Sequence, residues 1–411
     1  MKTAFIIAEY NPFHNGHLYH IEKTKEGTDA EAVVAVMSGN FVQRGDIAIG
    51  NKFLRAESAV RCGVDLVVEL PVKYAVSNAV HFAKGAVQTI KAFGIGGEIS
   101  FGASSSLEEL QQSLSLIEDK ELLRQIEEMS RLQGKTYPAA LDAVLRKANH
   151  TKTANILNDP NNVLALEYLK ALAGYNSLLP FAVERKLEKG HLSETETEGF
   201  ASAKYIRDGF YEDIRSHKDI CRSEYWKLIP ENAAETLISA YQDGHFPADR
   251  NKYDVASYSR LLCMTAQDFI RIDNVSHGLE NRIAQAIKNS SSTEEAIATI
   301  KSKRYTMARL RQIFTAAVLG VTKEQVDSAP SYLRVLAFNE TGRRLLARLR
   351  STAGIPIVTN LSDIIDNAAC AADAALEYGA DKLYDLCLPA PRGGNRPFLE
   401  HSVYIRNNAD R

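Results

Sequence analysis

Short apolar runs alternate with helical patterns through the first hundred residues, and this alternation restricts the possible folds more than any other feature. Apolar runs occupy 4–8 and 32–37, two further strands are predicted at 64–70 and 98–101, and the helical patterns lie at 16–25, 52–62 and 76–93. A short continuous apolar run is typical of a strand that is buried on both faces. Strands that alternate with helices predict an α/β fold with a parallel sheet and right-handed crossovers.

The pattern changes after the first half of the chain. A charged amphipathic helix is predicted over 107–133, further helices up to about residue 173, one more strand at 180–186 and an exposed acidic loop at 193–199. From residue 213 the pattern is helical until another apolar run at 355–358. We therefore expect an α/β domain at 1–212 and a mainly helical domain at 213–411.

Composition excludes several classes of protein. The chain has 411 residues with 49 basic and 51 acidic side chains, so a uniformly basic surface is excluded. Its five cysteines are dispersed without metal-ligand spacing, and we expect reduced thiols and no protein-held metal site. We find no export signal or membrane-length apolar stretch, which predicts a cytoplasmic protein with no membrane contact. No obligate protein partner is evident.

The segment from Glu9 to His17 lies between the first predicted strand and the first helix. A glycine at position 16 allows close approach of a phosphate, and the N-terminus of the following helix favours an anion. His14 and His17 can then both donate hydrogen bonds to a triphosphate. The alternatives are two surface histidines or a zinc pair. Zinc-binding helices usually use an i, i+4 spacing, and no third ligand is evident.

A loop after the second strand adds positive charge to the same sheet edge. Arg44 and Lys52 are candidates to neutralise phosphates beside His14 and His17, and Asn40 to orient a substrate. A structural turn closed by Gly39 and Gly45 is the alternative. We predict His14, His17, Arg44 and Lys52 as the catalytic residues.

Basic residues concentrate in the helical half. Between residues 281 and 350 there are thirteen basic and five acidic side chains. Tyr305 follows two of the cations, so it could stack on an unpaired base, although a solvated helix face is the alternative. The candidate RNA-contacting residues are Lys301, Lys303, Arg304, Tyr305, Arg309 and Arg311.

Several strings resemble a known family. His14-Asn15-Gly16-His17 after a first strand resembles the HxGH signature of the nucleotidylyltransferase superfamily, which is related to class I aminoacyl-tRNA synthetases. Longer strings resemble the bacterial tRNA(Met) cytidine acetate ligase family, and they cover most of the chain: 9–17, 37–45, 65–71, 137–140, 160–164 and 303–306.

The resemblance implies a Rossmann-like sheet of the HIGH/HUP type that binds ATP with Mg²⁺, followed by a helical tRNA-binding region. It implies an enzyme that activates acetate as acetyl-adenylate, releasing pyrophosphate. The acetyl group then passes to N4 of the wobble cytidine in the anticodon loop of elongator tRNA(Met), and AMP is released. Glu9 is a candidate general base for that step.

The resemblance also implies ATP-binding residues. The first group is continuous in sequence: Ile7, Ala8, Glu9, Tyr10, Asn11, Pro12, Phe13, His14, Asn15, Gly16, His17, Leu18, Tyr19 and His20. The others are Gly102, Asn162, Arg185, Ser202 and Arg207. From the residues alone, Gly102 is typical of a turn, Asn162 and Ser202 of helix caps, and Arg185 of a solvated charge. Lys204 departs from the family pattern, which has Ser or Thr there.

Two other functions remain open. One is an adenylyltransferase that acts on a small phosphorylated metabolite, which would not need a basic helical half. The other is a non-catalytic RNA-binding protein that keeps the fold, which the intact His14/His17 pair disfavours.

Overall fold

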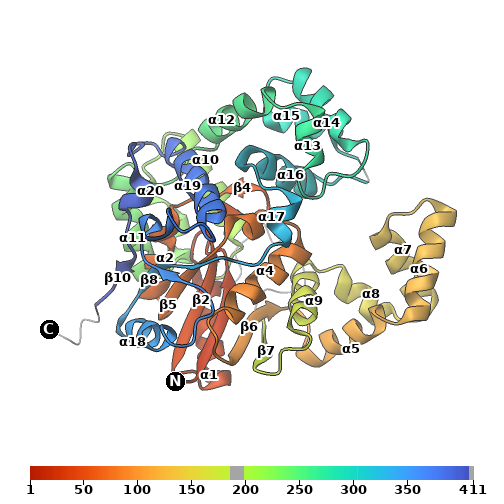
Figure 1. The fold of residues 1–411 in the computed structure, drawn as a ribbon, viewed down its shortest axis with the longest axis horizontal. Coiled ribbons are helices and arrows are strands. Elements are labelled where there is room, and N and C mark those ends of the chain that lie inside the picture. Colours follow the sequence, from red (N-terminus) through yellow and green to blue (C-terminus); the bar gives the residue numbers. More distant parts are fainter. Residues whose placement is uncertain (186–198, 303, 407–411) are drawn as a thin grey trace.

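A mostly parallel sheet forms the centre of the protein, with helices packed around it (Figure 1). The computed structural model describes residues 1–185, 199–302 and 304–406. The sheet order is β10-β8-β5-β2-β1-β6-β7, with β9 paired to β8. Its strands are β1 (Thr3–Ala8), β2 (Ala32–Ser38), β5 (Leu66–Leu70), β6 (Gly97–Ala103), β7 (Leu178–Glu184), β8 (Leu333–Phe338), β9 (Ile357–Val358) and β10 (Val403–Tyr404). The expected α/β fold and its parallel pairing through β5, β2, β1, β6 and β7 are confirmed.

The edge of the sheet beyond β5 was not foreseen. Strand β8 pairs antiparallel with β5, and β10 pairs parallel with β8. A small antiparallel hairpin, β3 (Phe41–Val42) and β4 (Asp46–Ile47), also follows β2. Because β8 and β10 come from the second half of the chain, the division expected near residue 212 does not separate the sheet from the helices.

Helices fill the crossovers and most of the second half. Before β7 they are α1 (Asn15–Thr28), α2 (Lys52–Arg61), α3 (Val72–Ala75), α4 (Ala79–Lys91), α5 (Leu107–Ile117), α6 (Lys120–Gln133), α7 (Tyr137–Lys147), α8 (Thr151–Leu157) and α9 (Pro160–Leu172). After β7 they are α10 (Ala203–Arg215), α11 (Glu231–Gln242), α12 (Arg250–Leu262), α13 (Ala266–Ile270), α14 (Leu279–Lys288), α15 (Thr293–Ile300), α16 (Met307–Leu319), α17 (Lys323–Asp327), α18 (Glu340–Leu349), α19 (Ala371–Leu386) and α20 (Arg396–Leu399). Three 3₁₀ helices cover Ile220–Arg222, Glu224–Leu228 and Leu361–Ile364.

The single helix expected over 107–133 is two helices. The Asp119 side chain accepts hydrogen bonds from the Glu121 and Leu122 backbone N–H groups, so it caps a new helix, α6. A carboxylate that satisfies free N–H groups in this way favours a helix start over a continuous helix. The acidic loop expected at 193–199 lies almost entirely outside the described residues. Among those described, no helix is both long and apolar enough to cross a membrane.

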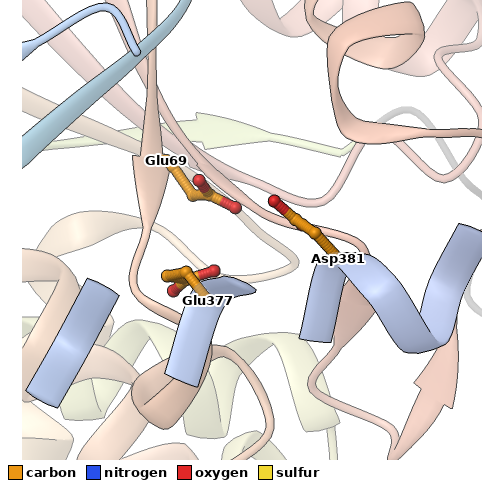
Figure 2. A group of neighbouring side chains, drawn as sticks. All are labelled: Glu69, Glu377 and Asp381. Atoms are coloured by element: carbon orange, nitrogen blue, oxygen red, sulfur yellow. The ribbon is translucent and has the colours of Figure 1, made fainter. Parts of the chain in front are cut away.

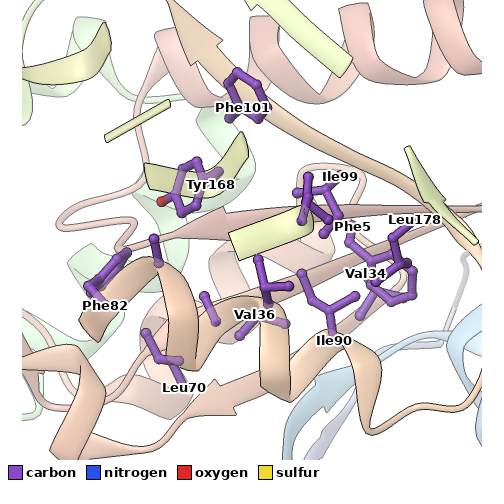
Figure 3. Close-up of a cluster of buried hydrophobic side chains, with 14 of the residues drawn as sticks. Phe5, Val34, Val36, Leu70, Phe82, Ile90, Ile99, Phe101, Tyr168 and Leu178 are labelled. Carbon is purple, nitrogen blue, oxygen red and sulfur yellow. The ribbon is translucent and has the colours of Figure 1, made fainter. Parts of the chain in front are cut away.

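The main core lies between the sheet and helices α4 and α9 (Figure 3). Phe5, Val34 and Ile99 from three adjacent strands contact this layer, and Phe82 and Ile90 of α4 pack onto it. Helix α4 is capped by Asn78, whose side chain accepts from the His81 N–H. Each fully buried side chain of this size contributes about 1.5–3 kcal/mol, so the packing of α4 and α9 holds the strand ends at fixed positions.

A buried network of charges joins α19 to the sheet (Figure 2). The Lys52 ammonium lies 2.7 Å from Glu69 Oε1 and 2.7 Å from Asp381 Oδ1, and all three side chains are almost fully buried. Arg334 of β8 donates to Asp381 Oδ2 at 3.0 Å. Although burial raises the pKa of Asp381, Lys52 and Arg334 hold it below its usual range.

Glu377 is the third carboxylate of this network. Its oxygen accepts the Val72 backbone N–H at 2.5 Å. Burial, followed by the nearby Glu69 carboxylate, raises the pKa of Glu377 well above its usual value. The other two carboxylates, Glu69 and Asp381, face the two cations Lys52 and Arg334.

Replacement of Lys52 by Met should lower the free energy of unfolding by about 3–5 kcal/mol, because it leaves buried carboxylates without their main cation. The control is Lys218→Met, since Lys218 is 66% exposed and pairs with Asp213 at the surface. The control should cost less than about 1 kcal/mol. Chemical denaturation monitored by circular dichroism measures both, and equal losses would show that the buried network does not stabilise the fold.

Candidate active site

A cavity of about 290 Å³ opens at the carboxyl ends of β1, β6 and β7. Ligands of open α/β sheets bind at this edge, which is where the sequence placed the site. The cavity is lined by Ile6, Ile7, Ala8, Glu9, Tyr10, His14, Gly16, His17, Tyr19, His20, Gln43, Arg44, Phe82, Phe101, Gly102, Asn161, Leu164, Tyr168, Val183, Glu184, Arg185, Phe200 and Ala201.

The segment between β1 and α1 is fixed by buried contacts. Asn11 accepts the Ile49 N–H on its side-chain oxygen at 2.7 Å, and its carbonyl accepts from Arg207 at 2.5 Å. Phe13 is almost fully buried, and its ring packs against Tyr10 with 4.9 Å between centroids. The Asn-Pro-Phe lead-in is therefore a structural support that aims the following residues at the cavity.

His14 and His17 start α1 and bind each other's backbone region. The Gly16 N–H donates to His14 Nδ1 at 3.1 Å, and the His14 N–H donates to His17 Nδ1 at 3.2 Å. The two rings are stacked with 3.7 Å between centroids. Because each Nδ1 is an acceptor, each neutral ring carries its proton on Nε2. Both histidines therefore offer an N–H donor for a ligand in the cavity.

The environment keeps these histidines neutral. Burial, and then the positive charges of Arg185 and Arg207, lower the pKa of His14 to about 3. Burial and the neighbouring His14 lower the pKa of His17 well below its usual value. His20 donates to or accepts from Ser100 Oγ at 2.9 Å, and burial followed by Arg185 lowers its pKa to about 4. The site thus collects neutral donors together with arginines, a combination that suits a polyanion.

Gly16 gives the His14 ring its position. A Cβ atom at residue 16 would lie 2.9 Å from His14 Cε1, closer than side-chain carbons approach one another. The glycine is therefore required for the stacked ring as well as for phosphate approach.

Arg55 holds together the loops around the cavity, and the sequence did not single it out. Its buried guanidinium donates to the carbonyls of Glu9, Ser38 and Gly39, at the ends of β1 and β2. Its Nε donates to the Gly50 carbonyl at 2.8 Å. An arginine in an amphipathic helix looks the same in sequence whether it is exposed or buried, so no pattern could have marked it.

Most predicted binding residues line the cavity, but some of them lie behind its wall. Those on the wall are Ile7, Ala8, Glu9, Tyr10, His14, Gly16, His17, Tyr19, His20, Arg44, Gly102 and Arg185. Asn11, Pro12, Phe13, Asn15 and Leu18 are not part of the wall. Asn15 instead donates to the carbonyls of Gly199 and Lys227. Residues 7–20 therefore divide into a face that meets the ligand and a face that anchors the segment.

Lys52 does not belong to this site, which corrects the expectation that it neutralises phosphates. Its ammonium is fully buried and held by Glu69 and Asp381 in the network under the sheet edge. A lysine already paired with two carboxylates has no free charge for a ligand. Arg44, in contrast, is exposed at the cavity wall and forms no ion pair with any described residue.

Asn162, which is predicted to contact ATP, and its neighbour Asn161 lie at the start of α9. Asn162 is buried and not on the wall. It accepts the Ser104 N–H at 3.0 Å and donates to Ser105 at 3.2 Å. Asn161 lines the cavity and accepts from Arg185 at 3.2 Å. Asn161 is therefore the amide on the cavity wall, while Asn162 fixes the loop after β6.

The second predicted phosphate-binding segment, with Ser202 and Arg207 at α10, lies beside the cavity. Ser202 caps the helix by accepting the Tyr205 N–H, and Phe200 and Ala201 are the residues of this segment on the wall. Lys204 pairs with Asp208 at 2.9 Å. Arg207 supports the Asn11 carbonyl, so it acts on the first motif through the backbone.

An apolar wall was missed by the sequence interpretation. Phe82, Phe101, Leu164, Tyr168 and Val183 line the cavity opposite the polar segment. They follow the spacing of core positions, so their sequence signal is that of core residues. An apolar wall in the same cavity as polar donors matches a nucleoside that carries phosphates.

The predicted RNA-contacting residues of the helical half are only partly available. Tyr305 is 4% exposed, so the expectation that its ring stacks on a base is wrong for this arrangement. Its ring is surrounded by Arg282, Arg304 and Arg309, with 5.3–5.5 Å from each guanidinium to the centroid. Arg311 pairs with Glu294, while Lys301 is exposed; Lys303 lies outside the described residues.

Comparisons with known proteins agree with this geometry. The HIGH Nucleotidyl Transferase family matches residues 1–396. The tRNA(Met) cytidine acetate ligase of Acetivibrio thermocellus is 34% identical, covering 98% of this chain and all of that protein. The protein of that name from a Thermoanaerobacter species is 38% identical over 88% of this chain and 89% of its own length.

A solved structure extends the likeness to three dimensions. Thermotoga maritima TmcAL bound with alpha-thio ATP superimposes with a TM-score of 0.88 at 30% identity, covering 99% of this chain and all of that one. The apo form of the same protein gives a TM-score of 0.89. With its HxGH histidines at the carboxyl edge of a parallel sheet, the chain belongs to the HIGH nucleotidyl transferases and, within them, to the tRNA(Met) cytidine acetate ligase family.

Proposed function

We propose that this protein is an ATP-dependent acetate ligase that forms N4-acetylcytidine at the wobble position of elongator tRNA(Met). The observation that carries the proposal is the His14/His17 pair, which presents two neutral Nε2–H donors to a cavity with an apolar wall. The family's name for its members and the ATP analogue held by the Thermotoga protein support the choice of substrates.

In the first step, an acetate oxygen attacks the α-phosphorus of ATP. The new bond gives acetyl-adenylate, and the bond from the α-phosphorus to pyrophosphate breaks. His14 and His17 donate hydrogen bonds to phosphate oxygens, and Arg44 and Arg185 on the cavity wall neutralise the charge of the leaving group. These side chains act by position and charge, so neither histidine has to accept a proton.

In the second step, the cytidine N4 amine attacks the acetyl carbon and AMP leaves. The amine must lose a proton as the new C–N bond forms. Glu9 is the candidate acceptor because it lines the cavity directly after β1. One of its oxygens accepts the Gln43 N–H at 2.9 Å, which fixes the carboxylate and leaves the second oxygen for the substrate.

Mg²⁺ is expected to enter with ATP. This ion keeps several waters and is held chiefly by substrate phosphates with one or two carboxylates. Glu184, the other carboxylate that lines the cavity, fits the role of such a carboxylate. When bound, the ion would supply positive charge to the phosphates.

The assay incubates purified protein with labelled acetate, ATP and tRNA(Met). Label that enters the tRNA only when ATP is present supports the ligase. Formation of an AMP–metabolite adduct with no label in tRNA would instead identify the metabolite adenylyltransferase. A protein that retains tRNA without any ATP turnover would be the non-catalytic binder.

The histidines can be tested by a matched pair of variants. His14→Ala removes one donor to the phosphates and should reduce the rate of acetyl-adenylate formation by about 100-fold or more. His277→Ala, at an exposed position outside the cavity, is the control and should keep wild-type activity. Filter binding should show that both variants retain tRNA. An active His14→Ala variant would remove the role assigned to this residue.

The neutral state of the histidines can be measured without catalysis. A histidine whose folded pKa lies below 6.5 stabilises the fold above that pH, and this stability is lost as the pH falls toward the folded value. For His20, with a folded pKa of about 4, the window is pH 6.5 to 4. Over that window its loss amounts to about 1.4 kcal/mol per pH unit.

His20→Gln should therefore make the stability less dependent on pH between 6.5 and 4. The free energy of unfolding at several pH values, from denaturant titrations, gives the slope. His277→Gln is the control, because it removes a histidine at an exposed position outside the cavity, and it should keep the wild-type slope. A wild-type slope in the His20 variant would contradict the assignment of a neutral buried ring.

A further inference from the structure

Helices α5 to α8 form an arm that extends away from the sheet beyond α9 (Figure 1). The arm occupies the connection between β6 and β7, and it has a small apolar core of its own. That core consists of Leu122, Ile126, Ala140, Val144, Leu145 and Ala154. Helices α6 and α7 are therefore held mainly by this small core, whereas Leu110 and Ile117 of α5 pack into the main core beside the sheet.

Both ends of the arm begin at the cavity. The chain leaves the wall at Gly102 and returns to it at Asn161. Two hydrogen bonds join the two ends of the arm. The Ser104 hydroxyl donates to Asp159 Oδ2 at 2.5 Å, and the Ser104 backbone N–H donates to Asn162 Oδ1 at 3.0 Å. The arm is thus fixed to the wall of the active site.

Charge is unevenly distributed along the arm. Residues 107–129 contain seven acidic and two basic side chains, whereas residues 130–152 contain five basic and one acidic. Two of those basic residues are already paired, since Arg146 contacts Asp142 and Lys152 contacts Glu109. Arg131 and Lys135 form no ion pair with any described residue.

The turn between α6 and α7 presents these free charges beside exposed apolar groups. We call residues 131–137 the arm tip; all of them are exposed. Leu132 is 70% exposed and Tyr137 is 51% exposed, so an apolar side chain and an open aromatic ring lie beside the two unpaired cations. Cations next to an open aromatic ring form a surface that suits RNA, which offers phosphates and stackable bases.

We propose that the arm tip is a second contact surface for tRNA, which binds the RNA outside the base that reacts in the cavity. The proposal rests on the proposed function. Arg131 and Lys135 contact phosphates, and Tyr137 packs on an exposed base or ribose. This surface is separate from the basic helices at 281–350, where the aromatic ring is already covered by arginines.

The size of the arm indicates a large partner. Helix α6 has 14 residues, so at 1.5 Å per residue it is about 21 Å long. A mononucleotide in the cavity does not extend that far. A folded RNA whose anticodon loop enters the cavity does, and its negative charge complements the tip.

The central experiment measures tRNA affinity of Arg131→Glu/Lys135→Glu at several salt concentrations. The double variant should bind tRNA(Met) about tenfold more weakly at 0.1 M salt, on the order expected for two lost phosphate contacts. The slope of log Kd against log salt should fall by about 1–2. Affinity for ATP should stay at the wild-type value, because the tip lies outside the cavity wall.

Lys120→Glu is the matched control, since it reverses an exposed charge at the other end of the same helix. It should change tRNA affinity by less than twofold. A further comparison uses the variants Tyr137→Ala and Tyr137→Phe. The alanine variant should weaken binding several-fold with an unchanged salt slope, and phenylalanine should restore it because the ring is retained.

Wild-type tRNA affinity in both the double variant and Tyr137→Ala would overturn the proposal. That result is also the one expected if the arm tip bound a protein instead of tRNA. If the double variant also loses ATP binding, its weaker tRNA binding is not informative. The comparison of Tyr137→Ala with Tyr137→Phe then tests whether the arm tip contacts tRNA. Failure of the proposed function is distinguishable, because then the wild-type protein itself would not transfer acetate to tRNA.

Discussion

Two buried cations on α2 hold the edge of the sheet on which the site is built. Arg55 donates to carbonyls at the ends of β1 and β2, and Lys52 pairs with Glu69 at the end of β5 and with Asp381 of α19. Without Arg55, carbonyls at the strand ends would lie buried and unpaired, which is costly in a protein interior. One helix thus fixes three parallel strands and connects them to the C-terminal part of the chain.

This support explains how the cavity can keep uncharged histidines next to arginines. The His14 and His17 rings are held by backbone N–H groups on one side, which fixes their protons on the other. A site organised in this way needs no rearrangement to receive a polyanion, and its donors already point toward the ligand. The apolar wall from Phe82 to Val183 excludes water on the opposite side.

Local patterns predicted the parts of the fold that depend on local sequence. Strands β1 and β2 were found because their apolar runs are continuous, β5 and β6 because they follow helical patterns in alternation, and the HxGH segment because its spacing is specific. Strand β8 was missed because Arg334 interrupts its apolar run and its partner lies far away in sequence. The remaining predictions that failed concern residues whose burial the sequence pattern does not show. In the sequence, Lys52 and Tyr305 resemble surface residues, and only the contacts of Lys52 with Asp381 and of Tyr305 with three arginines show that they are buried. Asn161 and Asn162 are adjacent in sequence, and only the structure shows that the first lines the cavity and the second bonds to the loop after β6.

The antiparallel pairing of β8 with β5 has a consequence for synthesis of the chain on the ribosome. Residues 1–185 hold nearly the whole cavity wall, yet the edge of β5 stays open until residues 333–338 are made. The Lys52–Glu69 pair also lacks its neighbours Arg334 and Asp381 until those residues are made. A nascent chain with an open strand edge is prone to pair with other chains. The residues of the cavity wall are therefore synthesised long before the strand that completes the sheet. Between these two stages the open edge of β5 is accessible to chaperones.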